Sequence, residues 1–285
     1  MHSNPGRPSI RRVAFVLAIA SLVATLVHAG PVALKTTELG RGPTVVFVPG
    51  LGSSRTDWLP TARKLLGRYR IVLVDLPGHG ESPLPDPFSF AIAGEALDAV
   101  FAKQNPESTI VVAHQMGGRP VLAALAAHPG RVKGVVLIDV PVGLPIPIDD
   151  QQKKQFLDFM DQNYDMVANR MFGNLGRDTT QSKAIYTAFS QTPAATVKAF
   201  IREAFYTDGN KDAKMLKIPA RFVFSSRIWK QGQTSGATFK QYGWEDTTAA
   251  AVRVPESAYW AMKDQPDTLA AIIGEFAAAR IAAKK

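Results

Sequence analysis

The chain has 285 residues, of which 46% are hydrophobic and 20% charged, and this suits one large domain with a sizeable core. The formal net charge is +9, but the basic residues are dispersed and form no stripe with aromatic side chains, so we expect no nucleic-acid binding. The absence of cysteine excludes a disulfide framework and lipid attachment through cysteine.

The first 29 residues differ in composition from the rest of the chain. Arginines, the last of them Arg12, precede an apolar run over 13–27. The run closes on Val27-His28-Ala29, a small-x-small cleavage pattern that is typical of a secretory signal peptide. We predict a signal peptide over 1–29, Sec-type export and a periplasmic or secreted protein. The run is short for a membrane span, so we expect no stable span after cleavage, with an uncleaved anchor as the alternative.

Apolar strands alternate with amphipathic helices in the segment that follows. The pattern predicts strands over 32–39, 44–48, 71–74, 109–113 and 134–139, and helices over 55–69, 90–102 and 118–127. Uniformly apolar strands separated by helices are typical of a mostly parallel sheet that is covered on both faces.

The pattern changes after Asp139, where several prolines mark a boundary. Helical patterns without a strand follow, at 149–163, 181–190 and 194–206. We therefore predict a helical cap over 141–217, inserted between two parts of the core at 30–140 and 218–285. Most aromatic and methionine side chains of this insert should be ordinary packing, and some should line an adaptable apolar pocket. They are Phe156, Phe159, Met160, Tyr164, Met166, Met171 and Phe172.

The last part of the chain predicts two more strands, at 221–224 and 250–254, and a closing helix at 268–283. The whole sequence contains no dinucleotide fingerprint and no His-x-x-x-His spacing. We therefore expect neither a cofactor nor a metal site.

Four segments, in order along the chain, resemble the α/β-hydrolase superfamily of esterases and lipases. They are Val-Phe-Val-Pro-Gly-Leu-Gly-Ser at 46–53, Asp-Leu-Pro-Gly-His-Gly-Glu-Ser at 75–82, His-Gln-Met-Gly-Gly at 114–118, and Asp-Gln-Pro at 264–266. The third segment follows a buried strand and opens a helix, as a nucleophile elbow does. The resemblance implies an α/β-hydrolase fold with an inserted cap over the pocket.

The resemblance also implies a serine, an acid and a histidine, and this chain departs from the pattern at all three positions. Gln115 stands at the elbow, the segment 225–228 after the expected acid strand has no carboxylate, and Tyr259 stands at the histidine position. No histidine follows His128. A carboxamide is not a nucleophile near neutral pH, so we do not expect triad-dependent hydrolysis.

The main-chain part of the family's machinery does not depend on side-chain identity. The resemblance implies an oxyanion hole made by the backbone N–H groups of Leu51 and Met116, which polarises a carbonyl or holds an anion. Gln115 is either a ligand-binding amide or a residue tolerated after catalysis was lost. Tyr259 is either a hydrogen-bond donor or, as we favour, an aromatic side chain that fills the imidazole site beside Trp260.

No residue can be assigned as catalytic from the sequence. Ser53 and Ser54 lie near the oxyanion loop and are weak candidates for a relocated nucleophile. His114 and His79 are weak candidates for a base, and packing or loop structure is the better interpretation of both. Asp139 ends a strand where acids can sit, but with no histidine to orient we expect a solvent contact.

The leading hypothesis is a non-hydrolytic pocket protein that binds a small apolar ligand, which can carry a carbonyl group. One alternative is an enzyme that uses the pocket and the oxyanion hole for a non-covalent isomerase or lyase step, or an atypical esterase with a relocated nucleophile. Another alternative is a protein-interaction module, which a pocket collapsed onto Tyr259 and Trp260 would favour.

Overall fold

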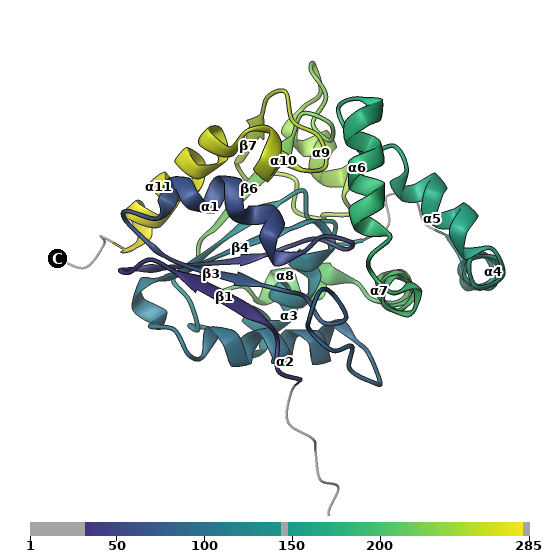
Figure 1. The fold of residues 1–285 in the computed structure, drawn as a ribbon, viewed down its shortest axis with the longest axis horizontal. Helices are drawn as coiled ribbons and strands as arrows, with labels where there is room; N and C mark the ends of the chain where they lie inside the picture. The colour runs from purple at the N-terminus through teal and green to yellow at the C-terminus, as the bar shows by residue number, and fades with distance from the viewer. Residues whose placement is uncertain (1–31, 144–147, 282–285) are drawn as a thin grey trace, which may run out of the picture. The chain divides into compact units, whose positions relative to one another are not determined.

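The computed structural model describes residues 32–143 and 148–281. The predicted signal peptide at 1–29 lies outside these residues. A seven-stranded sheet forms the centre of the described part, in the order β1-β3-β2-β4-β5-β6-β7 (Figure 1). Its strands are β1 (Thr36–Leu39), β2 (Thr44–Val48), β3 (Arg70–Val74), β4 (Thr109–His114), β5 (Gly134–Ile138), β6 (Ala220–Ser225) and β7 (Ala251–Val254).

All strand pairs of this sheet are parallel except β1 with β3. Successive side chains of a strand point to opposite faces, and both faces of β2 are buried. Val45 and Phe47 join one hydrophobic cluster, and Val46 and Val48 join the other. The α/β architecture with a mostly parallel central sheet is therefore confirmed.

Helices cover both faces of the sheet (Figure 1). On one face α1 (Leu59–Leu65) packs against α11 (Pro266–Ile281), and on the other α2 (Phe90–Phe101) packs against α3 (Gly118–Ala127). Side chains of α1 and α11 belong to the cluster of Val45, and those of α2 and α3 to the cluster of Val46.

The segment between β5 and β6 is helical. Figure 1 shows its first four helices beside the sheet rather than on either face. The helices of this insert are α4 (Asp150–Gln162), α5 (Tyr164–Phe172), α6 (Thr179–Phe189), α7 (Ala194–Tyr206) and α8 (Gly209–Met215). Within the described residues, no helix is both long and apolar enough to cross a membrane.

Some element boundaries were predicted wrongly. β1 is shorter than the predicted strand at 32–39. The predicted helix at 55–69 is a 3₁₀ turn at Arg55–Trp58 followed by α1, because Pro60 has no N–H and fits only the first turn of a helix. The pattern also missed four short helices, namely α5, α8, α9 (Ser235–Gln241) and α10 (Ala261–Asp264).

Candidate functional site

Gln115 occupies the apex of an intact elbow. β4 ends at His114, Gln115 has φ of +49°, and α3 begins at Gly118. Left-handed backbone costs a non-glycine residue about 1–3 kcal/mol, so the surrounding structure imposes this geometry. A Cβ on Gly117 would lie 1.9 Å from the carbonyl oxygen of Pro49, so only glycine allows this close approach. The elbow that the family resemblance implies is therefore present, with an amide in place of a nucleophile.

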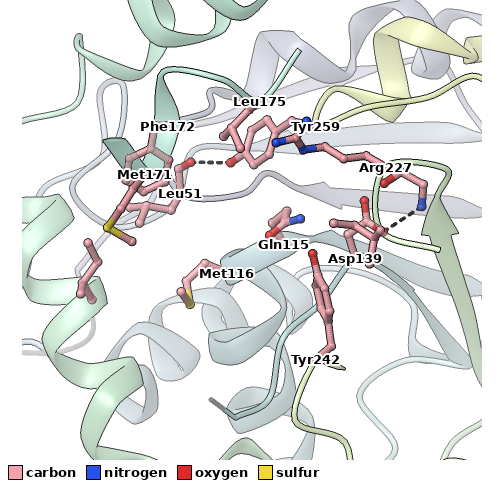
Figure 2. A pocket seen from close by; sticks show the side chains of 13 residues that line it. Leu51, Gln115, Met116, Asp139, Met171, Phe172, Leu175, Arg227, Tyr242 and Tyr259 are labelled. Carbon is pink, nitrogen blue, oxygen red and sulfur yellow. Dashed lines mark hydrogen bonds between the residues drawn. The ribbon is translucent and has the colours of Figure 1, made fainter. Parts of the chain in front are cut away.

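A cavity of about 250 Å³ lies above Gln115, between the ends of the parallel strands and the helical insert (Figure 2). The insert supplies part of its apolar wall, from α5, from the loop that follows it and from α7. The cavity is lined by Leu51, Gln115, Met116, Asp139, Met171, Phe172, Leu175, Ile201, Ser225, Arg227, Ile228, Tyr242 and Tyr259.

Polar and apolar side chains are segregated across this cavity. In Figure 2, Asp139 and Tyr242 lie on one side of Gln115, and Met116 and Met171 lie on the other. A ligand in the cavity therefore meets hydrogen-bonding groups at one end and soft apolar side chains at the other.

Asp139 is the buried charge of the site. Its side chain is 0% exposed, its φ is +51°, and its Oδ1 accepts a hydrogen bond of 2.8 Å from the N–H of Ser225. Its Oδ2 has no partner among the described residues. Burial raises the pKa of Asp139 to about 7, against the opposing effect of the hydrogen bond from the Ser225 backbone. The predicted solvent contact is wrong, because the segment 225–228, Tyr242 and the insert enclose this strand end with it.

Two tyrosines present phenols to the cavity. Tyr259 is 8% exposed, and its hydroxyl donates a hydrogen bond of 2.6 Å to the carbonyl oxygen of Leu51. Burial raises the pKa of Tyr259 above its usual value. Burial and the charge of Asp139 do the same for the pKa of Tyr242. Both phenols therefore stay protonated at neutral pH and act as hydrogen-bond donors.

The predicted oxyanion residues Leu51 and Met116 both line the cavity. Among the described residues, the N–H of Leu51 donates to no protein acceptor, whereas the next N–H, that of Gly52, donates to Nε2 of His79 over 3.1 Å. Met116 lies in the first turn after the strand, where helical N–H groups lack partners within the helix. The two residues that the resemblance assigns to the oxyanion hole thus line the same cavity.

His79 is a structural residue of the loop after β3. Its Nδ1 lies 3.0 Å from the carbonyl oxygen of Pro77, so the tautomer with the proton on Nδ1 satisfies both ring nitrogens. The ring stacks edge-on against Phe200 of α7. Burial lowers the pKa of His79 to about 4, so the ring is neutral. His79 therefore links the oxyanion loop to the insert without lining the cavity.

The structure does not bring the other weak candidates into the cavity. Ser53 is 4% exposed, and Ser54 precedes the 3₁₀ turn that it caps. His114 is 0% exposed and lies edge-on to the rings of Trp58 and Tyr259. Burial lowers the pKa of His114 to about 3, so it too is neutral. Within the described residues, no serine or histidine of this group lines the space above Gln115.

Sequence reasoning missed three groups of the site. Tyr242 and Arg227 were not assigned to it: Tyr242 directly follows α9, a helix that the pattern missed, and Arg227 lies in the loop after β6. The terminal nitrogen of Arg227 donates to the carbonyl oxygen of Asn174 over 2.6 Å, which attaches the insert to the loop after β6. The third group is Asp139, whose position at a strand end was the available signal.

The insert contributes fewer pocket residues than its composition suggests. Met171 and Phe172 line the cavity, whereas Phe159 and Met166 are exposed at 47% and 55%.

Among the described residues, no group of three or more histidine, aspartate or glutamate side chains is placed to hold a metal ion.

Comparison with known proteins places this geometry in a family context. The family model described as alpha/beta hydrolase fold matches residues 43–271. A pimeloyl-(acyl-carrier protein) methyl ester esterase of Methylococcus capsulatus is 35% identical over 100 residues, or 35% of this chain and 37% of that protein. A 2-(acetamidomethylene)succinate hydrolase of Mesorhizobium japonicum is 31% identical over 123 residues, or 41% of this chain and 42% of that protein. The chain thus spans about 40% of the curated relatives that it matches.

Solved structures extend the likeness to most of the chain. A thermophilic esterase of Thermogutta terrifontis has a TM-score of 0.69 at 18% identity, over 85% of this chain and 92% of that one. The enol-lactonase of Burkholderia xenovorans has a TM-score of 0.67 at 17% identity, over 85% of this chain and 95% of that one. At these identities the likeness establishes the fold alone.

Proposed function

This chain belongs to the α/β-hydrolase fold family, and from that premise we propose that it is a non-hydrolytic member that binds a small, mostly apolar ligand with a carbonyl group. One observation carries the proposal: Gln115 stands at the strained apex of an intact elbow, beneath an open cavity. No imidazole of the described residues lines that cavity. The fold keeps the pocket while the groups for covalent catalysis are missing.

The oxyanion residues and the relatives support a carbonyl group on the ligand. The N–H groups of Leu51 and Met116 are hydrogen-bond donors fixed by the backbone, and a carbonyl oxygen is the acceptor that such donors suit. The amide of Gln115 adds both donors and an acceptor at the floor of the cavity. The relatives named above act on a methyl ester and an acetamido compound, which both contain carbonyl groups.

The proposal extends to the setting of the pocket. The insert between β5 and β6 acts as a cap, because its residues Met171, Phe172 and Ile201 close the cavity from above. The protein is exported through the signal sequence at 1–29, so its ligand is periplasmic or extracellular.

Turnover and covalent labelling of the purified protein test this function. We expect no hydrolysis of a panel of p-nitrophenyl esters and no labelling by a fluorophosphonate probe. We also expect a screen of neutral carbonyl compounds to yield ligands that raise the melting temperature. Ester turnover that copurifies with the protein and disappears in a Gln115→Ala variant would overturn the proposal, as would labelling of Ser53 or Ser54.

A second candidate function is a non-covalent proton-transfer reaction. Asp139 favours it, because this residue lines the cavity and a buried carboxyl group with a pKa of about 7 exchanges a proton near neutral pH. Loss of turnover in Asp139→Asn, with binding of the substrate retained, would distinguish this function from simple binding. No observation favours the interaction module, since the cavity is open and Trp260 does not line it.

A further inference from the structure

A second cavity adjoins the first one beneath the insert. It has a volume of about 200 Å³ and lies between α3, α7 and the segment after β5. Its lining residues are Met116, Arg119, Pro141, Gly143, Met171, Ile201, Ala204 and Phe205. Three of them, Met116, Met171 and Ile201, also line the first cavity. The two cavities therefore adjoin at these three residues.

Two of the three side chains in this wall are methionines. Methionine is unbranched and has a polarizable thioether, so it changes rotamer and fills irregular gaps with little strain. Met171 is 40% exposed, and this leaves space into which its side chain can move. Rotamer changes of Met116 and Met171 are therefore the movement that would join the two cavities.

Among the described residues that line it, the second cavity offers an apolar tail site and no unpaired charged side chain. Its one charged side chain, Arg119, is 3% exposed and already engaged. The guanidinium donates to the carbonyl oxygen and the hydroxyl of Thr207 over 3.0 and 2.9 Å, and it lies 4.9 Å from the centre of the Phe90 ring. A ligand head group gains little there, whereas an alkyl chain is buried among Ile201, Ala204 and Phe205.

The polar end of the first cavity offers the opposite chemistry. Asp139 lines the cavity, and its buried Oδ2 has no protein partner among the described residues. Leaving such an oxygen unpaired is costly, so it fits a ligand that brings its own N–H or O–H donor. Tyr242 lies on the same side of Gln115 as Asp139, and both Tyr242 and Gln115 supply further donors (Figure 2).

We propose that the two cavities form one elongated site for an unbranched, medium-chain carbonyl compound whose neutral head carries an N–H or O–H group. The head lies between Asp139 and Gln115, and the tail passes Met116 and Met171 into the second cavity. A primary alkanamide has this chemistry, because its N–H donates to Asp139 and its carbonyl oxygen accepts from backbone N–H groups. This inference rests on the proposed function and names the ligand class.

Calorimetric titration with butanamide, hexanamide, octanamide and decanamide tests the elongated site. Each added methylene that becomes buried should tighten binding by roughly fourfold until the second cavity is full. Ala204→Leu fills the second cavity from α7, so it should abolish the gain for the longer amides and leave butanamide binding unchanged. Ala213→Leu is the matched control, because Ala213 lines a separate apolar cavity beside β6. Asp139→Ala should weaken all four amides by about tenfold, since each loses the same head contact.

The outcomes separate this inference from the proposed function. Affinity that does not depend on chain length, or the same chain-length series in Ala204→Leu and Ala213→Leu, overturns the elongated site and leaves a short-ligand pocket in place. If Ala204→Leu is too unstable to titrate, Ala204→Val provides the same comparison with a smaller side chain. Failure of every alkanamide to bind overturns the ligand class, while the screen of other carbonyl compounds decides the proposed function separately.

Discussion

The hydroxyl of Tyr259 donates a hydrogen bond of 2.6 Å to the carbonyl oxygen of Leu51, which joins the loop after β7 to the loop after β2. The N–H of the same peptide group, that of Gly52, donates to Nε2 of His79. The peptide between Leu51 and Gly52 is thus held at both ends by side chains from distant segments. Tyr259 stands where the family resemblance places a catalytic histidine, and here the side chain at that position fixes the oxyanion loop.

The bond between Tyr259 and Leu51 should contribute measurably to stability. Tyr259→Phe removes only the hydroxyl and leaves the ring in place, so the free energy of unfolding should fall by about 1 kcal/mol. Urea denaturation measures this change. Tyr206→Phe is the matched control, because Tyr206 is 52% exposed and the loss of its hydroxyl should have no effect. Equal stabilities of the two variants would show that the hydrogen bond makes no net contribution.

Asp139 should make stability fall as pH rises. Its pKa is raised from 3.8 to about 7 in the folded protein, so the folded state binds this proton more tightly than the unfolded state. The contribution of the protonated Asp139 to the free energy of unfolding is fully present below pH 3.8 and is lost as pH rises to about 7. The total loss is on the order of 4 kcal/mol. Asp139→Asn keeps the shape without the charge, so its advantage over wild type should grow between pH 4 and 7. Urea denaturation measures the free energy of unfolding at each pH. If this energy changed with pH equally in wild type and Asp139→Asn, the prediction would be contradicted.

His79 should produce a loss of stability in acid. Burial lowers its pKa from 6.5 to about 4, so the unfolded chain takes up this proton first as pH falls. The contribution of neutral His79 to the free energy of unfolding is fully present above pH 6.5. It declines toward pH 4, by up to about 3 kcal/mol. His79→Gln keeps a donor and an acceptor and cannot titrate, so its stability should change less over this range. His114, with a pKa lowered to about 3, remains in both proteins and contributes to the loss that is common to both. If His79→Gln lost as much stability in acid as the wild type, His79 would be excluded as the source of that loss.

The fold could be predicted well because each buried strand is recognisable from its own short run of apolar residues. The segments 44–48 and 109–113 are uniformly apolar, and in the structure they are adjacent parallel strands buried on both faces. The substituted triad positions could also be identified from the sequence, because Gln115 and Tyr259 lie at fixed distances from recognisable motifs.

The contents of the cavity were much less predictable than the fold. Asp139 and Tyr242 meet only because a strand end and a loop about a hundred residues later fold over the same space, and no local pattern encodes that contact. The residues of the insert that line the pocket were equally hard to predict. Composition does not distinguish an aromatic side chain that lines a pocket from one that does not. Phe159 is exposed on α4, whereas Phe172 lines the cavity.

The strain at the elbow should be measurable by comparing glycine with alanine. Gln115 has φ of +49°, a conformation that glycine adopts freely and that any residue with a Cβ adopts at a cost. Gln115→Gly should therefore be more stable than Gln115→Ala by about 1 kcal/mol, since both lack the amide and only alanine keeps the Cβ. Thermal or urea denaturation gives the comparison. Alanine as stable as glycine would mean that the elbow relaxes once the glutamine is removed.

Restoring two side chains should restore weak esterase activity. A Cβ on Gly50 would lie 2.9 Å from the Cβ of Gln115 and 3.1 Å from the Tyr259 hydroxyl, so these two positions approach the same point. Asp139 lines the same cavity as Gln115 and Tyr259, so its carboxyl group is the acid available on that side. Gln115→Ser with Tyr259→His therefore places a nucleophile, an imidazole and an acid around one cavity.

Hydrolysis of p-nitrophenyl acetate by the double variant should exceed that of either single variant by roughly 10²-fold, because a serine without a base and a base without a nucleophile are both ineffective. A fluorophosphonate probe should label the double variant alone. Adding Asp139→Asn should reduce turnover, since the imidazole then loses the carboxylate that stabilises its protonated form. A double variant no more active than Gln115→Ser would show that the elbow and position 259 no longer hold the relative geometry that catalysis needs, because every chemical group of the triad is then present.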